Sequence, residues 1–469
     1  MFSDRHRRRW FPVKRWGGFV LGLLLASCTW SAVGQSSRLT PQPADKFVDS
    51  VGLNVRMSYG DWPTATHWNH PDPKQNSRQL IEALGIRHLR DRIPHPNLQA
   101  AISYVNPRLA SLYLNSGMTF IVGVDNRRED GTLDPSQTPA FIDWYGNGDI
   151  TAENGERVRV REMIEAIEGP NEYDRHHKPE QREADWAANL NAYQAQIYAA
   201  VNAEPTLADL PVVAPSLIHT EYCRSPLNTF TASADLGNLH PYPNYPYMRH
   251  PTATLGWHLD RVTDCSAAQP IWATETGYLT QSNPEGISER TAAKYTPRLL
   301  TEYFLTGRIE RTFFHEIARD TVDGWGLVAV DGDQLRPKPA YYAVKSLLDL
   351  LREATWDSEQ RQWRSPETAP QPVAIAFEGK QAATHHLLLQ KRDRRYALLL
   401  WQEVESYNPD QGNFEVPPDE VTVQLPPGAR SPVVHTYNAA FTYDDQPLED
   451  GRQIELSVPD SVMVLEFTL

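Results

Sequence analysis

Two glutamates, Glu172 and Glu275, are the side chains of this sequence best placed to do chemistry. Each closes a short apolar run at a loop that contains glycine or proline, which is how a strand delivers a carboxylate to the mouth of a barrel. Two carboxylates at one mouth can cleave a glycosidic bond, because one protonates the leaving oxygen while the other attacks the sugar or activates water. Most glutamates that follow strands are solvated caps or ion-pair partners. The neighbouring residues therefore provide the evidence for or against a catalytic role.

Asn171, directly before Glu172, adds a side-chain amide that can donate a hydrogen bond to a sugar hydroxyl. An Asn-Glu pair that ends a fourth strand, with a Glu that ends a seventh, resembles the retaining glycoside hydrolases of clan A, the (β/α)8 group that includes cellulases and β-xylosidases. The resemblance implies that Glu172 is the acid/base and Glu275 the nucleophile. It also implies a β-linked substrate and carboxyl groups about 5 to 5.5 Å apart, the separation used in double displacement.

The elements that must position these residues alternate between strand and helix, which favours a parallel sheet. Helical patterns such as residues 185–201 lie between the strand candidates. Such a barrel needs roughly 250 residues or more, and residues 47–354 supply them. We therefore predict an α/β fold with a (β/α)8 TIM barrel. The predicted strands are residues 51–59, 86–93, 119–125, 166–172, 211–217, 236–242, 270–275 and 311–317.

The remainder of the chain has a different pattern. From about Trp356 onward the helical periodicity ends and short alternating strands begin, which predicts a β-sandwich over residues 355–469. Several clan members end in a small β-sandwich packed on the barrel, and we expect a structural role for this one, with sugar binding as the lesser alternative. The predicted strands are residues 384–390, 396–404, 420–425, 432–437, 453–458 and 461–467.

The resemblance assigns further residues to the site. His240 and Tyr242 end the sixth strand and match the clan's His-x-Tyr element, in which the His faces the sugar and the Tyr hydrogen-bonds the nucleophile. Arg90 matches the clan's strand-two arginine. Its guanidinium can hold Glu275 ionised and oriented, and a structural salt bridge with Asp91 or another barrel carboxylate is the alternative.

Strand eight departs from the clan pattern. Many relatives carry a Trp there, whereas this chain has His315 followed by Glu316. Trp325 is therefore our candidate for the floor of the first sugar subsite. Glu316 is a third carboxylate, for which a structural or hydroxyl-binding role is favoured because the Asn-Glu context is absent. Aromatic residues in predicted strand-to-helix loops favour an extended glycan cleft, although for any one of them loop packing is the favoured interpretation: Trp62, Trp68, Trp144, Tyr145, Tyr245 and Tyr247.

The amino terminus has the pattern of an export signal. Within residues 1–34 a basic region precedes the apolar stretch of residues 19–26, which is too short for a membrane span. Residues 25–28 resemble a bacterial lipobox, so Cys28 is a candidate for lipidation and a membrane tether, with ordinary cleavage near residues 32–34 as the alternative. Both routes predict a periplasmic or extracellular protein. Residues 35–46 are rich in Ser, Pro and Gln and predict a poorly ordered linker.

The net charge and the cysteine content limit the kinds of ligand and cofactor that the protein is expected to bind. The formal net charge is −14, and removing residues 1–34 takes away six basic and one acidic side chains and leaves −19. So acidic a body makes nucleic acid an improbable partner and favours neutral over strongly anionic glycans, unless the cleft is locally basic. Cys223 and Cys265 remain after export and can either pair or stay separate thiols. No Cys and His spacing fits zinc. Double displacement needs no metal or organic cofactor, so we expect none. We also expect the protein to be a monomer.

Three alternatives are open. The barrel can have lost catalysis and serve as a glycan-binding envelope lipoprotein, or it can be a transglycosylase that uses the same two carboxylates. A metal-dependent barrel hydrolase is disfavoured, because a His-x-His would be expected after strand one and the chain has Asn54, Val55 and Arg56 there. The shape of the loops around the site determines which sugar binds, and one sequence does not reveal that shape. Glucan, xylan, mannan, galactan and the producer's own exopolysaccharide are therefore all candidate substrates.

Overall fold

The computed structural model of the 469-residue chain describes residues 37–59, 66–97, 103–174, 185–227, 229–245, 247–281, 285–319, 324–366 and 369–469. The predicted signal segment with Cys28, and Trp62, lie outside the described residues. In the described part of the chain, no helix has both the length and the apolar character that crossing a bilayer requires.

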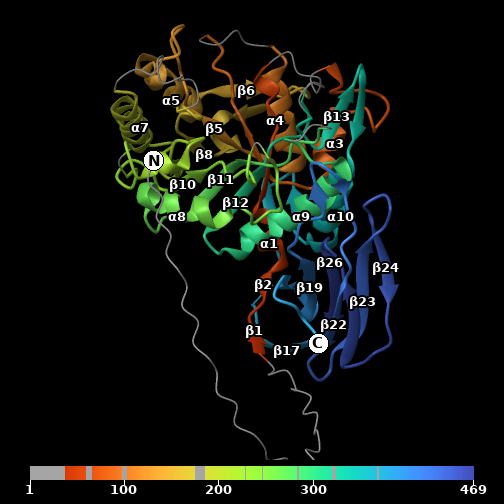
Figure 1. The fold of residues 1–469 in the computed structure, drawn as a ribbon. Helices are drawn as coiled ribbons and strands as arrows, with labels where there is room; N and C mark the ends of the chain where they lie inside the picture. Colours follow the sequence, from red (N-terminus) through yellow and green to blue (C-terminus); the bar gives the residue numbers. More distant parts are fainter. Residues whose placement is uncertain are drawn as a thin grey trace, which may run out of the picture. The chain divides into compact units, whose positions relative to one another are not determined.

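Eight parallel strands form the wall of a barrel (Figure 1). They are β3 (Val51–Asn54), β4 (His88–Asp91), β5 (Thr119–Gly123), β8 (Ile164–Glu168), β9 (Val212–Val213), β10 (Gly237–Leu239), β11 (Ile271–Thr276) and β12 (Ile309–Phe314). The last strand, β12, pairs with the first, β3, and a single parallel bridge between Val213 and Leu236 joins β9 to the start of β10. All the strands predicted for the barrel are present in the predicted order, so the predicted fold class is confirmed.

Helices connect most of these strands. They are α3 (Ser77–Ala83), α4 (Val105–Ser116), α5 (Thr138–Asn147), α6 (Val160–Met163), α7 (Trp186–Ala203), α8 (Leu255–Ser266), α9 (Glu289–Leu305) and α10 (Pro339–Leu351). Two hairpins are inserted among them, β6 (Asp149–Thr151) with β7 (Arg157–Arg159), and β13 (Val328–Asp331) with β14 (Gln334–Pro337). Short 3-10 turns occur at η1 (Met57–Tyr59) and η2 (Pro135–Gln137).

The connection from β9 to β10 departs from the predicted strand-helix repeat. Its described residues contain only a 3-10 turn, η3 (Thr220–Cys223), where an α-helix was expected. Cys223 in this turn forms a disulfide with Cys265 in α8, with the two Cα atoms 5.0 Å apart. The structure thus resolves the choice between paired and separate thiols. The disulfide links this connection covalently to the neighbouring helix α8.

The barrel interior is filled by apolar side chains that alternate with outward-facing ones along each strand. This inner cluster consists of Ile121, Ala166, Val213, Leu236, Trp272 and Phe313, all at most 8% exposed. Gly52 on β3 makes room for it, because a Cβ there would lie 2.3 Å from Cδ1 of Phe313. A larger cluster fills the space between the strands and the surrounding helices. The functional side chains are therefore carried on a wall that is packed on both faces.

The carboxyl-terminal region contains two antiparallel sheets. A six-stranded sheet has the order β2-β18-β19-β26-β23-β24 and a four-stranded sheet has the order β1-β17-β22-β25. The strands are β17 (Val373–Glu378), β18 (Thr384–Gln390), β19 (Arg395–Gln402), β22 (Asp419–Gln424), β23 (Arg430–Tyr437), β24 (Tyr443–Pro447), β25 (Gln453–Val458) and β26 (Met463–Thr468). Two smaller hairpins pair β15 (Thr355–Asp357) with β16 (Gln362–Arg364), and β20 (Tyr407–Asn408) with β21 (Gly412–Asn413), while η4 (Arg392–Arg394) turns between β18 and β19. The predicted β-sandwich is thus observed.

Strands β18 and β19 are buried on both faces, which accounts for their nearly continuous leucine runs. Leu388 and Leu398 pack against the second sheet, whereas Leu389 and Trp401 belong to the same apolar cluster as the barrel helices. Because of this shared core, Ser36–Leu469 forms one compact unit.

The predicted linker is ordered where the structure describes it, so this part of the prediction is wrong. Strand β1 (Ser37–Leu39) pairs antiparallel with β17, and β2 (Gln42–Pro43) pairs parallel with β18, as Figure 1 shows for the red strands beside the blue ones. Helix α1 (Ala44–Asp49) follows, and its Asp45 accepts a hydrogen bond from Nη1 of Arg87 at 3.0 Å. The open edges of β17 and β18 supply backbone partners that the local composition does not reveal.

Candidate active site

A cavity of about 1060 Å³ opens at the carboxyl ends of the barrel strands. Every residue assigned to the site from the sequence lines it: Arg90, Asn171, Glu172, His240, Tyr242, Glu275 and Trp325. They come from β4, β11 and the segments that follow β8, β10 and β12. The structure therefore brings together seven side chains spread over more than half of the chain.

Glu275, near the end of β11, is surrounded by hydrogen-bond donors. Its Oε1 accepts from Nη1 of Arg90 at 2.6 Å, and its Oε2 accepts from the hydroxyl of Tyr242 at 3.0 Å. The Nδ1 atoms of His315 and His240 lie 3.5 and 3.8 Å from Oε2. Burial alone would raise the pKa of Glu275, but His240, His315 and Arg90 outweigh it and hold this pKa well below its usual range. The carboxylate is thus ionised and oriented.

Arg90 on β4 forms hydrogen bonds with several side chains of the site. Besides Glu275 it binds the two oxygens of Glu168, from Nε at 2.6 Å and from Nη2 at 3.0 Å, and its Nη2 donates to Oδ1 of Asn171 at 2.7 Å. Arg90 therefore makes the contacts that both accounts of it require, since it pairs with Glu275 and with another barrel carboxylate. Asp91 takes no part and instead accepts hydrogen bonds from the backbone of Met57 and the side chain of Ser58.

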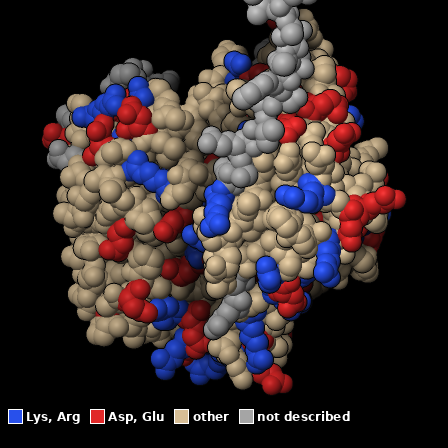
Figure 2. Space-filling model, turned by 90° about the horizontal axis from the view of Figure 1, so that it is seen from below, with Lys and Arg blue, Asp and Glu red and all other residues tan. Residues whose placement is uncertain are grey.

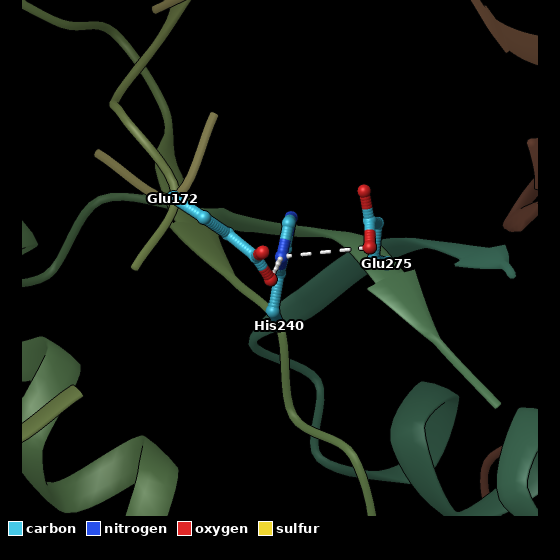
Figure 3. A group of neighbouring side chains, drawn as sticks. All are labelled: Glu172, His240 and Glu275. Atoms are coloured by element: carbon cyan, nitrogen blue, oxygen red, sulfur yellow. Dashed lines mark hydrogen bonds and ion pairs between the residues drawn. The ribbon is translucent and has the colours of Figure 1, made fainter. Parts of the chain in front are cut away.

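Glu172 follows β8 at a backbone φ of 45°, in the left-handed region. Such strain in a residue other than glycine persists only where the surroundings hold it, and here the backbone N–H of Glu172 donates to the carbonyl oxygen and to Oγ of Ser216, both at 3.1 Å. The side chain is buried, with Oε1 2.8 Å from Nδ1 of His240 (Figure 3). One carboxylate oxygen of Glu172 and one of Glu275 lie within 4.8 Å of each other, with His240 between them.

The hydrogen bonds of His240 fix where its protons are. Nε2 lies 3.0 Å from Oγ1 of Thr274. The single hydroxyl hydrogen of Thr274 has two acceptors, Oε1 of Glu168 at 2.9 Å and Oδ1 of Asn238 at 2.8 Å. Because that hydrogen is used there, Thr274 can only accept from His240, so Nε2 carries a hydrogen. Nδ1 of His240 is then the ring nitrogen that faces Oε1 of Glu172, and at 2.8 Å the two atoms are close enough for proton transfer.

The amide of Asn171 is oriented by its oxygen. Oδ1 accepts from Nη2 of Arg90 and, at 3.2 Å, from Oγ of Ser216. Arginine can only donate, so the oxygen assignment is firm and the –NH2 group is the end of Asn171 left for a ligand in the cavity.

Aromatic side chains form one wall of the cavity. Trp325 packs edge to face on Tyr242 with ring centroids 5.2 Å apart, and lies nearly parallel to Tyr245 at 6.3 Å. Tyr245 and Tyr247 are more than half exposed. Trp325 and Tyr245 both line the cavity.

Other aromatic residues predicted for the cleft have a different role. Trp68 and Tyr145 are almost fully buried, at 1% and 0% exposed, so the packing interpretation favoured for each single residue is confirmed for both. The indole N–H of Trp68 donates to Glu153, which satisfies it inside the fold. Trp144 is partly buried and donates to the carbonyl oxygen of Ile93 at 3.3 Å, which also makes it a packing residue.

Four polar residues of the site were missed from the sequence. Glu168, Asn238 and Thr274 are buried, and they connect Arg90 to His240 through hydrogen bonds. Asn54 accepts from Nη1 of Arg90 at 3.1 Å. Asn54 and Glu168 are the last residues of β3 and β8, and that position at a strand end is the signal that could have found them.

One oxygen or nitrogen atom each from Glu172, His240 and Glu275 lie close enough to hold a cation. The guanidinium of Arg90, 2.6 Å from Glu275, already supplies positive charge at this point, and a metal ion would meet like charge there. The geometry suits proton transfer and nucleophilic attack better than metal binding.

The chain matches no protein-family model and no curated protein sequence. Its structure is similar to that of an α-L-arabinofuranosidase from Thermotoga maritima in complex with arabinose, with a TM-score of 0.57 and 11% identity over 92% of this chain and 98% of the other. A glucosidase from Croceicoccus marinus gives a TM-score of 0.52 and 11% identity over 93% and 98% of the two chains. A family 30 endoxylanase from Clostridium papyrosolvens gives 0.50 and 11% over 92% and 98%. At these identities the similarities show the fold, a (β/α)8 barrel followed by a β-rich carboxyl-terminal region.

Proposed function

We propose that the protein is a retaining glycoside hydrolase that cleaves β-glycosidic bonds in a poly- or oligosaccharide by double displacement. The observation that carries this proposal is the pair of Glu172 and Glu275, which have carboxylate oxygens within 4.8 Å of each other in one cavity. Retaining enzymes place their carboxyl groups about 5 to 5.5 Å apart, whereas inverting enzymes leave about 6.5 to 9.5 Å for a water molecule.

In the first step an electron pair of the Glu275 carboxylate attacks the anomeric carbon. The bond from that carbon to the leaving oxygen breaks, and Glu172 transfers its proton to this oxygen. The products are a glycosyl ester on Glu275, a released alcohol and a Glu172 carboxylate. Arg90 and Tyr242 keep the attacking carboxylate ionised and oriented, and the –NH2 group of Asn171 is placed to donate to a sugar hydroxyl.

In the second step Glu172 acts as the base. It takes a proton from a water molecule whose oxygen attacks the anomeric carbon, and the ester bond to Glu275 breaks. Both carboxyl groups return to their starting states and the sugar leaves with its original configuration. His240 supports this cycle because its Nδ1, 2.8 Å from Glu172, is close enough for proton transfer between the two groups.

The substrate class rests on the cavity. Trp325 and Tyr245 offer ring faces of the kind on which sugars stack. The similar structures include an α-L-arabinofuranosidase, a glucosidase and an endoxylanase, so furanosides as well as β-linked pyranosides belong in any test of the substrate.

Export is part of the proposal. The pattern of residues 1–34 and the candidate lipidation site at Cys28 motivate it, and the disulfide between Cys223 and Cys265 supports it, because such bonds persist mainly outside the cytoplasm.

The test is covalent trapping. The purified protein is incubated with dinitrophenyl 2-deoxy-2-fluoro glycosides of glucose, xylose, mannose, galactose, glucuronic acid and arabinofuranose, and the adduct is located by peptide mass spectrometry. We expect an adduct on Glu275 with at least one sugar, and none in the E275Q variant. The E172Q variant should lose about 10²- to 10⁴-fold in kcat on substrates with poor leaving groups, while E420Q, which changes an exposed residue of β22, should match the parent protein.

An adduct on a peptide without Glu275 would overturn the assignment of the nucleophile. Binding of glycans without adduct or turnover would favour the glycan-binding lipoprotein, and sugar transfer to added acceptors in place of hydrolysis would favour the transglycosylase.

A further inference from the structure

Strand eight presents a histidine at the position where the clan resemblance leads one to expect a tryptophan. His315 directly follows β12, lines the cavity and is 6% exposed. Its Nε2 lies 3.2 Å from Oε1 of Glu316, and its Nδ1 lies 3.5 Å from Oε2 of Glu275. This Nδ1 is buried and makes no hydrogen bond to any residue that the structure describes. The mechanism above does not use it.

The surroundings of His315 favour its charged form. Glu316 is 0% exposed and lies behind the ring, and the ion pairs that Arg56 and Arg319 form with Glu316 are longer, at 3.7 and 3.9 Å. Burial would lower the pKa of His315, but the nearby carboxylates of Glu316 and Glu275 outweigh this and raise it. Each ring nitrogen faces a carboxylate, Nε2 that of Glu316 and Nδ1 that of Glu275, an arrangement that suits a hydrogen on both and makes Nδ1–H a donor at the edge of the cavity.

This donor has a poor partner in the protein. Oε2 of Glu275 already accepts from the hydroxyl of Tyr242 at 3.0 Å, whereas its distance of 3.5 Å from Nδ1 of His315 is at the limit for a hydrogen bond. Once Glu275 is esterified it loses its charge and attracts the imidazolium less. A buried charged donor without an acceptor is costly, and a sugar bound over Glu275 is the group that can supply one.

We propose that His315 is a substrate-binding, specificity-determining residue whose Nδ1–H donates to an oxygen of the sugar that Glu275 attacks. Glu316 is then a positioning residue that holds the ring from behind. The enzyme selects sugars that carry an oxygen acceptor at that point, either a hydroxyl or the carboxylate of a uronic acid. Trp325 then stacks on the sugar ring in place of the tryptophan that is absent from strand eight, and its ring centroid lies 5.7 Å from that of His315. This inference rests on the proposed function.

The test measures how fast Glu275 is trapped. The sugar that labels the parent protein fastest is compared with its single-deoxy analogues, and the glucoside is compared with the glucuronide. We expect one deoxy position to slow labelling of the parent protein by about 100-fold, because a site built to hydrogen-bond a hydroxyl rejects the analogue that lacks it. In H315F the same deoxygenation should cost less than about 3-fold, since the donor is gone.

The variant H315Q separates the two sources of the acceptor. For a hydroxyl acceptor, H315Q keeps an N–H donor and should retain most of the labelling rate. For a carboxylate acceptor, the glucuronide should be the fast probe, and H315Q should lose as much as H315F because the charge is lost. The control is H386F on β18 of the β-sandwich, which should leave every ratio unchanged. Ratios between analogues within one variant do not depend on how much of that variant is folded.

Two failures are distinguishable. If the parent protein labels on Glu275 and every deoxy penalty persists unchanged in H315F and H315Q, the role of His315 is wrong and the proposed function stands. If no sugar labels Glu275 in the parent protein, the proposed function falls and this inference falls with it.

Discussion

At the scale of the residue, the charge of Glu275 is set by groups from several strands. Arg90 comes from β4, while His240 and His315 follow β10 and β12. Tyr242 remains a neutral donor, because burial and the nearby charge of Glu275 raise its pKa well above 10. A carboxylate supported in this way remains a nucleophile under conditions in which an exposed glutamate would be protonated.

This arrangement predicts the pH dependence of labelling. A dinitrophenyl group needs no proton from Glu172 to leave, so the labelling rate reports the charge of Glu275. Because the pKa of Glu275 is depressed well below 4.5 in the folded protein, the rate should be level as pH falls through 4.5 and decline only further down. The measurement is the labelling rate between pH 3 and pH 8, with circular dichroism to confirm that the protein remains folded.

Removal of Arg90 gives the matched comparison. In R90M the pKa of Glu275 should rise, so the decline in labelling should move to higher pH, whereas R157M, an exposed arginine on β7, should behave like the parent protein. A decline of the parent protein centred near pH 4.5 would show that Glu275 is an ordinary carboxylate and would contradict the electrostatic account.

Glu172 and Glu275 were located from the sequence because each closes a predicted strand, and the strand ends of a parallel barrel meet at one mouth. Arg90 was assigned to the site from the resemblance to clan A. Thr274 was missed because it lies inside β11, two residues before its end. Whether such a residue points inward depends on strand register, which one sequence does not reveal.

At the scale of the element, the segment between β10 and α8 connects the cavity to the β-sandwich. Glu403, just after β19, accepts from the backbone N–H and the hydroxyl of Thr252, both at 3.0 Å, and from Nδ1 of His250 at 3.0 Å. Its other oxygen accepts from Nε and Nη2 of Arg298, on α9, at 2.9 and 2.7 Å. The same segment carries Tyr242, so one wall of the cavity is anchored on the carboxyl-terminal domain.

Glu403 should therefore matter for stability in a pH-dependent way. Burial would raise its pKa, but His250 and Arg298 lower it from 4.5 to about 2. Because the pKa of Glu403 is lower in the folded protein, its charge stabilises the protein at pH values above the unfolded-state pKa. This contribution declines below pH 4.5 and is lost as pH falls through about 2. E403Q should lower the free energy of unfolding at pH 7 by about 3 kcal/mol, because Arg298 is left buried without its partner. Urea unfolding at pH 7 and at pH 3 measures the difference.

The gap between E403Q and the parent protein should be smaller at pH 3 than at pH 7. The control E449Q changes an exposed residue before β25 and should unfold like the parent protein at both values. A gap that is equal at the two pH values would mean that the charge of Glu403 does not contribute to stability.

The elements were predictable to different degrees. Strands and helices of the barrel carry their own periodicity, so they were found from short windows such as residues 185–201, which correspond to α7. Strands β1 and β2 were not found, because they are only three and two residues long. Their pairing partners β17 and β18 lie more than 300 residues further along the chain. Strands this short exist only through such distant pairing, and composition alone indicated a linker.

At the scale of the whole molecule, the surface charge is mixed. Figure 2 shows basic and acidic side chains interspersed on the face that it draws, although the net charge is −14. That face offers no broad single-sign surface of the kind that binds nucleic acid. The basic side chains that matter for the proposed function, Arg90 above all, are inside the cavity instead.

The shared core predicts that the barrel and the β-sandwich fold together. Leu389 and Trp401 are fully buried in the cluster that also holds the barrel helices, and Arg298 is 0% exposed. A chain cut to residues 37–354 would expose this apolar face and leave Arg298 without Glu403, so we expect insoluble protein or loss of near-ultraviolet circular dichroism. Residues 37–469 should give one cooperative unfolding transition in guanidinium, with tryptophan fluorescence and far-ultraviolet circular dichroism changing together.

The control is the chain of residues 37–469 with its exposed hairpin of β20 and β21 shortened, which should unfold in the same manner. Two separated transitions, or a soluble native-like 37–354 fragment, would show that the domains are independent.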